Sequence, residues 1–149
     1  MTADPIALPY VDTSALAKRY LNEPFSLEVD AYLGTFTKVA ISTLTLLELR
    51  CLLARRRRND EITSEHVEHI RQALQDDVDF GSLRVLPTED HHLHLATSLV
   101  DSLAAHGLRS RDAMHLGIAE SNGARTLATA DIKMADAATA IGMDVVTSY

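Results

Sequence analysis

The chain has 149 residues, 46% of them hydrophobic, which suits a globular domain with a sizeable core. Its 14 basic and 21 acidic residues give a formal net charge of −7, which argues against a protein that holds nucleic acid by bulk charge alone. The apolar runs are too short to span a membrane, no secretory signal pattern opens the chain, and the single cysteine excludes an internal disulfide. We therefore expect one domain over residues 1–149, located in the cytoplasm.

Short apolar runs alternate with longer helical patterns along the chain. The predicted strands are residues 7–11, 38–41, 83–86, 126–129 and 145–146. The predicted helices are residues 13–21, 26–33, 42–58, 63–80, 87–107, 110–122 and 132–141. Pro9 keeps the first strand short or places it at a sheet edge, because proline cannot donate to a strand ladder. This alternation predicts an α/β fold of three layers, α/β/α, with helices on both faces of a central, mainly parallel sheet.

Acidic residues lie in or beside these apolar segments at four places, Asp12, Glu48, Asp112 and Asp131. Asp12 and Asp131 follow predicted strands, Glu48 interrupts a leucine-rich helix, and Asp112 lies in the first turn of a helix. Ionised carboxylates are costly to bury without a partner. Because sites in parallel α/β folds form beyond the carboxyl ends of the strands, we expect these acids to line one cleft there. A divalent cation held by oxygen ligands is the simplest common cause.

Each acid also has a purely structural interpretation. Asp12 and Asp112 suit the N-terminus of a helix, and Asp131 suits a turn. Glu48 suits a buried ion pair with an arginine. The occurrence of all four in this order favours a shared site.

The segments around the four acids resemble the sequence motifs of the PIN domain family. They are residues 10–16 with 18–20, then 46–49, 108–116 and 127–131. Their order and spacing are those of the bacterial VapC-type toxins, and the resemblance runs over nearly the whole chain. It implies a PIN-like domain that acts as a metal-dependent endoribonuclease, the toxin of a toxin–antitoxin pair. It also implies a homodimer that a small cognate antitoxin neutralises.

Carried over by position, the resemblance implies a catalytic and metal-binding quartet of Asp12, Glu48, Asp112 and Asp131. Asp12 and Asp112 are expected to be direct ligands of Mg²⁺ or Mn²⁺, whereas Glu48 and Asp131 bind the ion directly or through its waters. Ser14 and Thr129 are the accessory polar residues, and a role for Asp136 stays open. This residue set suits the chemistry, because carboxylate-held Mg²⁺ can neutralise a phosphate, activate water and stabilise the leaving oxygen of a phosphodiester.

Basic residues close to this quartet are candidates for RNA contact. Arg109 and Arg111 flank Asp112, and the arginine run 55–58 either contacts RNA or forms a solvated helix end.

Other reactive residue types are assigned to structural positions. Histidines 66, 69, 91, 92 and 94 lack the spacing of a zinc site and are expected on solvated helix faces. His115 lies one turn after Asp112 and can approach the site, but packing or a surface position is the expectation. Cys51 is expected to be a small buried hydrophobic residue.

Two alternative functions remain. One is a non-catalytic PIN-like module that binds RNA or a partner, against which the intact quartet argues. The other is an aspartyl-phosphate phosphatase, suggested by Asp12 after a strand. That chemistry normally needs a second acid two residues later, where this chain has Ser14.

Overall fold

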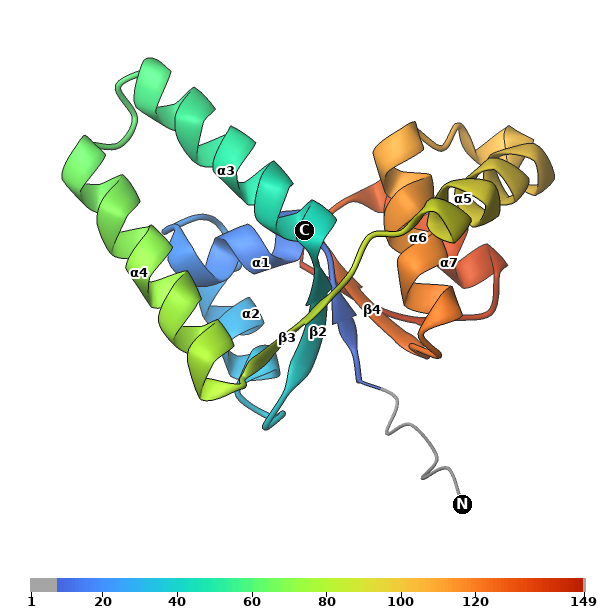
Figure 1. Ribbon diagram of the computed structural model, residues 1–149, viewed down its shortest axis with the longest axis horizontal. Coiled ribbons are helices and arrows are strands. Elements are labelled where there is room, and N and C mark those ends of the chain that lie inside the picture. Colours follow the sequence, from blue (N-terminus) through green and yellow to red (C-terminus); the bar gives the residue numbers. More distant parts are fainter. Residues whose placement is uncertain (1–7, 149) are drawn as a thin grey trace.

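A five-stranded sheet forms the central layer of the computed structural model, which describes residues 8–148 (Figure 1). The strands are β1 (Tyr10–Val11), β2 (Val39–Ser42), β3 (Leu83–Leu86), β4 (Thr126–Thr129) and β5 (Asp144–Thr147). They lie in the order β3-β2-β1-β4-β5, and every neighbouring pair is parallel. The predicted parallel α/β architecture is confirmed, while Ala7, at the start of the first predicted strand, lies outside the described residues.

The helices between the strands begin and end close to the predicted residues. They are α1 (Thr13–Tyr20), α2 (Ser26–Leu33), α3 (Thr43–Arg58), α4 (Ser64–Phe80), α5 (Asp90–Ser102), the 3₁₀ turn η1 (Ala104–His106), α6 (Ser110–Ser121) and α7 (Ile132–Ala140). The helix predicted over residues 87–107 was wrong at both ends. Thr88 stays outside α5 because its backbone N–H donates to Thr43 Oγ1 at 3.0 Å. After Ser102 the chain tightens into η1, which ends at Gly107 with a positive φ of 62°.

The shortest strand occupies the middle of the sheet. β1 has two residues, and it pairs with β2 on one side and β4 on the other. Pro9 precedes it and takes part only as an acceptor, since its carbonyl oxygen receives the Ala40 N–H at 2.9 Å. The proline therefore keeps the strand short, as predicted, but the alternative of an edge position is wrong.

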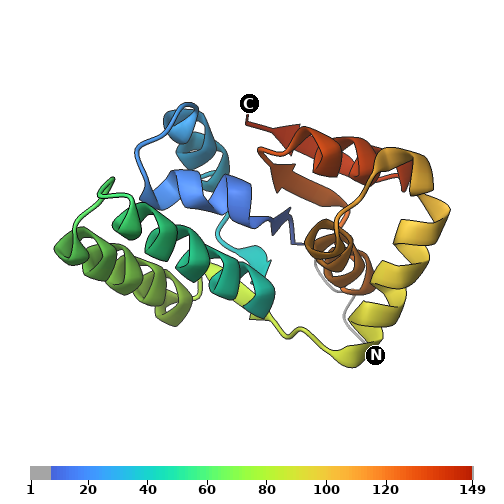
Figure 2. The ribbon, with the colours of Figure 1, turned by 90° about the horizontal axis from the view of Figure 1, so that it is seen from above.

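Successive side chains of the central strands point to opposite faces of the sheet, and a layer of helices covers each face (Figure 2). Val11 and Ile41 are buried against the layer of α1 to α4. Tyr10 and Leu127 are buried against the layer of α5 to α7. Because the sheet is apolar on both faces, it stays covered on both, which is typical of parallel sheets.

All strands point the same way, so their carboxyl ends meet at one edge of the sheet. Asp12 follows β1 and Asp131 follows the adjacent β4, which is in register with it through Val11 and Ala128. The cleft between the two helical layers opens at this edge. In the part of the chain that the structure describes, no helix has both the length and the apolar character needed to cross a bilayer.

The layer of α5 to α7 offers a direct test of the packing. Leu116 is fully buried on α6, so Leu116→Ala should lower the free energy of unfolding by about 2–5 kcal/mol in urea denaturation. The matched change Leu93→Ala, at a side chain that is 56% exposed on α5, should change it by no more than about 0.5 kcal/mol. Equal losses in the two variants would contradict this arrangement of the layers.

Candidate active site

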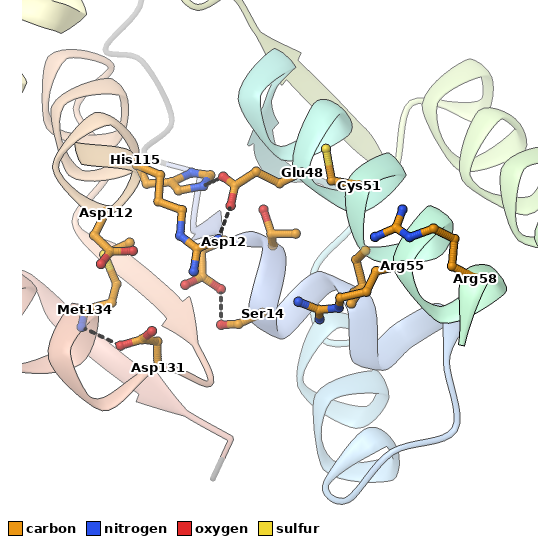
Figure 3. Close-up of a pocket in the computed structure, with 13 residues that line it drawn as sticks. Asp12, Ser14, Glu48, Cys51, Arg55, Arg58, Asp112, His115, Asp131 and Met134 are labelled. Carbon is orange, nitrogen blue, oxygen red and sulfur yellow. Dashed lines mark hydrogen bonds and ion pairs between the residues drawn. The ribbon is translucent and has the colours of Figure 1, made fainter. Parts of the chain in front are cut away.

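One cavity of about 530 Å³ lies at the carboxyl edge of the sheet, between α3 and α6 (Figure 3). All four predicted acids line it, Asp12, Glu48, Asp112 and Asp131. Ser14 lines the same wall as Asp12, and Arg55, Arg58 and Arg111 also line the cavity. The fold thus brings together acids that come from four separate segments, and it places cations beside them.

Asp12 is the most enclosed of these acids, with 4% of its surface exposed. Its Oδ1 accepts hydrogen bonds from Ser14 Oγ at 2.7 Å and from the Ala15 backbone N–H at 3.0 Å, and its Oδ2 accepts one from Thr129 Oγ1 at 2.5 Å. Burial raises the pKa of Asp12, and these hydrogen bonds oppose the rise because they favour the charged form. Asp12 therefore caps α1, as its structural interpretation required, and also faces the cavity.

Asp112 and Asp131 share a single cation. Arg109 places Nε 3.2 Å from Asp112 Oδ2 and Nη2 3.0 Å from Asp131 Oδ2. The hydrogen bond to Asp112 and the charge of that carboxylate raise the pKa of Arg109. Asp131 also caps α7 by accepting the Met134 N–H at 3.1 Å. Arg109, predicted as an RNA contact, thus lies against the acids in this structure.

Glu48 contacts both a histidine and an arginine. Its Oε1 lies 2.5 Å from Nε2 of His115, while the nearest guanidinium nitrogen of Arg111 is 3.9 Å from Oε2. His115 is 2% exposed, and its Nδ1 lies 2.7 Å from the hydroxyl of Tyr10. Burial is the main reason that the pKa of Tyr10 rises to about 12.

The expectation of packing or a surface position for His115 missed these polar contacts. One signal for them was present in the sequence, since His115 lies one helical turn after Asp112 and shares its face. Tyr10 carried no comparable signal.

Two further residues of α3 differ from expectation. Cys51, predicted to be buried, is exposed and lines the cavity, because it lies on the helix face that looks toward α6. Arg55 and Arg58 line the cavity, whereas Arg56 is turned away and pairs with Glu23. Asp136, whose role the sequence left open, is exposed on α7 and does not line this cavity.

His92 was also misplaced by the sequence. It is 1% exposed rather than solvated, its Nδ1 accepts the Glu89 N–H at 3.0 Å, and its Nε2 lies 2.9 Å from Ser121 Oγ. Within residues 8–148, Glu89, His91 and His92 are the only group of three or more His, Cys, Asp or Glu residues whose potential ligand atoms all lie within 4.8 Å of one another. Since both ring nitrogens of His92 already have partners, this group is better explained as the N-terminal cap of α5.

The cavity donors are carboxylate and hydroxyl oxygens, the set that Mg²⁺ and Mn²⁺ prefer. The cavity acids are spread more widely than the group at the start of α5. A wider spread fits Mg²⁺, because this ion keeps several of its waters and few carboxylates need to touch it. By chemistry and position, Asp12, Glu48, Asp112 and Asp131 are the residues able to hold such an ion.

In a comparison with protein families, the family model described as PIN domain matches residues 10–140. The chain belongs to the PIN domain family. This membership favours a PIN-like domain over the phosphatase alternative. A comparison with curated proteins finds no match.

Solved structures share this PIN fold. FitAcB from Neisseria gonorrhoeae is 19% identical with a TM-score of 0.73, and the match covers 95% of this chain and 98% of that one. VapC20 from Mycobacterium tuberculosis, described as a toxin that cleaves the sarcin-ricin loop, is 16% identical with a TM-score of 0.69, covering 90% and 95%. A toxin–antitoxin complex from Klebsiella pneumoniae is 20% identical with a TM-score of 0.65, covering 95% and 98%.

The buried carboxylate of Asp12 should make stability depend on pH. Its raised pKa means that the folded state loses stability as pH rises through that pKa, because the ionised form is better solvated after unfolding. Asp12→Asn should therefore be more stable than the parent protein at pH 7 in EDTA. The advantage should shrink as pH falls toward the ordinary aspartate pKa of 3.8. Urea denaturation across this range measures it, with Asp136→Asn as the exposed control. An Asp12→Asn difference that is the same at every pH would contradict the prediction.

Proposed function

We propose that this chain is a metal-dependent endoribonuclease and the toxin of a toxin–antitoxin pair. The observation that carries the proposal is the single cavity lined by Asp12, Glu48, Asp112 and Asp131, with arginines beside them. Membership of the PIN domain family supports it. So does the shared fold with VapC20, a toxin described as cleaving the sarcin-ricin loop.

The chain's own residues supply the ion site and its orientation. Mg²⁺ or Mn²⁺, when bound, neutralises phosphate charge and activates water for hydrolysis of the phosphodiester. Asp12 and Asp112 would hold the ion directly, and Glu48 and Asp131 would hold it directly or through its waters. Ser14 and Thr129 fix the Asp12 carboxylate by donating to different oxygens, so the side chain stays in one rotamer.

One arginine pairs with the acids, and three others are available to contact the substrate. Arg109 offsets the repulsion between Asp112 and Asp131, and its side chain is 52% exposed, so it can turn toward an incoming phosphate when an ion takes its place. Arg111, Arg55 and Arg58 line the cavity and face the RNA backbone in this proposal. Local basic surface of this kind compensates for the acidic net charge of the whole chain.

Protein partners form part of the same proposal. The Klebsiella pneumoniae relative is a toxin–antitoxin complex. We propose a cognate antitoxin for this chain, a homodimer in which two copies frame one RNA groove, and a cytoplasmic location where cellular RNA is the substrate. Solution scattering of the purified protein should report the mass of a dimer.

Catalysis should depend on the acids and on the ion. Asp112→Asn should lower RNA cleavage by about 100-fold or more, and EDTA should abolish the activity of the parent protein until Mg²⁺ or Mn²⁺ is restored. Asp136→Asn, an equal change on exposed α7, should cleave normally. Cleavage is followed on a labelled RNA with protein purified free of contaminating nuclease. Full activity of Asp112→Asn would exclude this mechanism, and binding of RNA without any cleavage by the parent protein would favour a non-catalytic module.

RNA affinity should depend on the arginines that line the cavity. Arg111→Gln and Arg55→Gln should each weaken RNA binding and reduce the slope of log affinity against log salt by about 1. Arg71→Gln, on α4 where Arg71 pairs with Glu68, should change neither quantity. Fluorescence anisotropy at several salt concentrations, in the Asp112→Asn background to prevent cleavage, measures both. Salt slopes that are equal in all three variants would refute this path for the RNA.

A further inference from the structure

A buried series of hydrogen bonds joins Glu48, on α3, to Ser42, the residue directly before that helix. Glu48 Oε1 lies 2.5 Å from His115 Nε2, and His115 Nδ1 lies 2.7 Å from the Tyr10 hydroxyl. That hydroxyl donates to Ser42 Oγ at 2.8 Å, and Ser42 caps α3, the helix that carries Glu48. Tyr10 and Ser42 are fully buried and His115 is 2% exposed, so water has little access to compete for these bonds.

This series of hydrogen bonds crosses the molecule from one helical layer to the other. Glu48 lies on α3 in the layer of α1 to α4, and Ser42 ends β2 in the central sheet, whereas His115 lies on α6 in the opposite layer. Tyr10, on the central strand, stands between them. Figure 3 shows the side chains of His115 and Glu48 meeting at the wall of the cavity. The contact therefore links an acid on α3 to the helix that carries Asp112.

Only one oxygen of Glu48 is taken by this contact. His115 holds Oε1, while Oε2 has Arg111 as its nearest charged neighbour at 3.9 Å, which is too long for a hydrogen bond. Oε2 is thus the oxygen that His115 does not hold, and it lies beside Arg111, which lines the cavity. A glutamate side chain has three torsions. Without a partner such as His115 these torsions would be free, and fixing them when a ligand binds would cost conformational entropy.

We propose that His115 is a positioning residue that fixes Glu48 with Oε2 toward the cavity, and that Tyr10 and Ser42 hold the imidazole in place. The consequence for metal binding rests on the proposed nuclease function, whereas the contact itself does not. Hydrogen-bonded partners of ligating carboxylates typically contribute about 10- to 100-fold to metal affinity.

The chain contains a matched control for this role. His92 is equally buried and also has partners at both ring nitrogens, but those partners are the Glu89 N–H and Ser121 Oγ, and no cavity acid is among them. Removing either imidazole should cost stability. Only the loss of His115 should change what Glu48 does.

Mn²⁺ binding to the full chain, measured by electron paramagnetic resonance of the free ion, tests the proposal without relying on cleavage. His115→Ala should raise the dissociation constant by about 10-fold or more, and His115→Gln should restore part of the affinity because its amide can reach Glu48. His92→Ala should leave the constant unchanged. In a Glu48→Gln background, His115→Ala should have no further effect, since a residue that acts through Glu48 loses its influence when the carboxylate is gone. Additive effects of the two changes would overturn the proposal.

Nitrogen-15 NMR of the imidazoles separates this proposal from the nuclease function. Glu48→Gln should shift the His115 Nε2 resonance and leave that of His92 unmoved. Tyr10→Phe, a conservative change that is useful if His115→Ala fails to fold, should shift His115 Nδ1. A His115 Nε2 signal that ignores Glu48→Gln overturns the positioning role. A parent protein that binds no Mn²⁺, but shows the expected NMR shifts, overturns the proposed function and upholds the contact.

Discussion

The site depends on a carboxylate buried at the end of the central strand. Asp12 is 4% exposed, and burial works against its charge, so Ser14, Thr129 and the N-terminus of α1 must supply hydrogen bonds. Thr129 belongs to β4, and its side chain reaches Asp12 only because β1 and β4 are adjacent and in register. The hydrogen bonding of Asp12 thus depends on the order of the strands, and the other three acids line the same cavity.

The other three acids have ionisable side chains as partners. Arg109 spans Asp112 and Asp131, and Glu48 contacts His115 and, at 3.9 Å, Arg111. Removing one partner of such a pair leaves a charge without compensation, which costs more than the pair contributes. The arrangement brings four acids to one cavity, and in the proposed nuclease a divalent ion would replace the charge of Arg109 there.

Each helical layer supplies one wall of this cavity. α1 and α3 supply one wall, with arginines 55 and 58 further along α3. α6 and α7 supply the wall that carries Asp112 and Met134. The cavity therefore has acids where the layers meet, Arg111 beside Glu48, and Arg55 and Arg58 further along α3.

Local sequence predicted most of the elements and pointed to the four acids that line the cavity. Strand and helix periods, the caps at Asp12 and Ser42, and the order of the motifs are short-range signals, so they were readable before any fold was known. Only tertiary structure placed β1 at the centre of the sheet and Cys51 at the cavity surface. It alone joined Tyr10 to His115, which lie 105 residues apart, because such a contact depends on strand order and on which layer each helix joins. Sequence periodicity reports that a face is buried, but it does not report what that face meets.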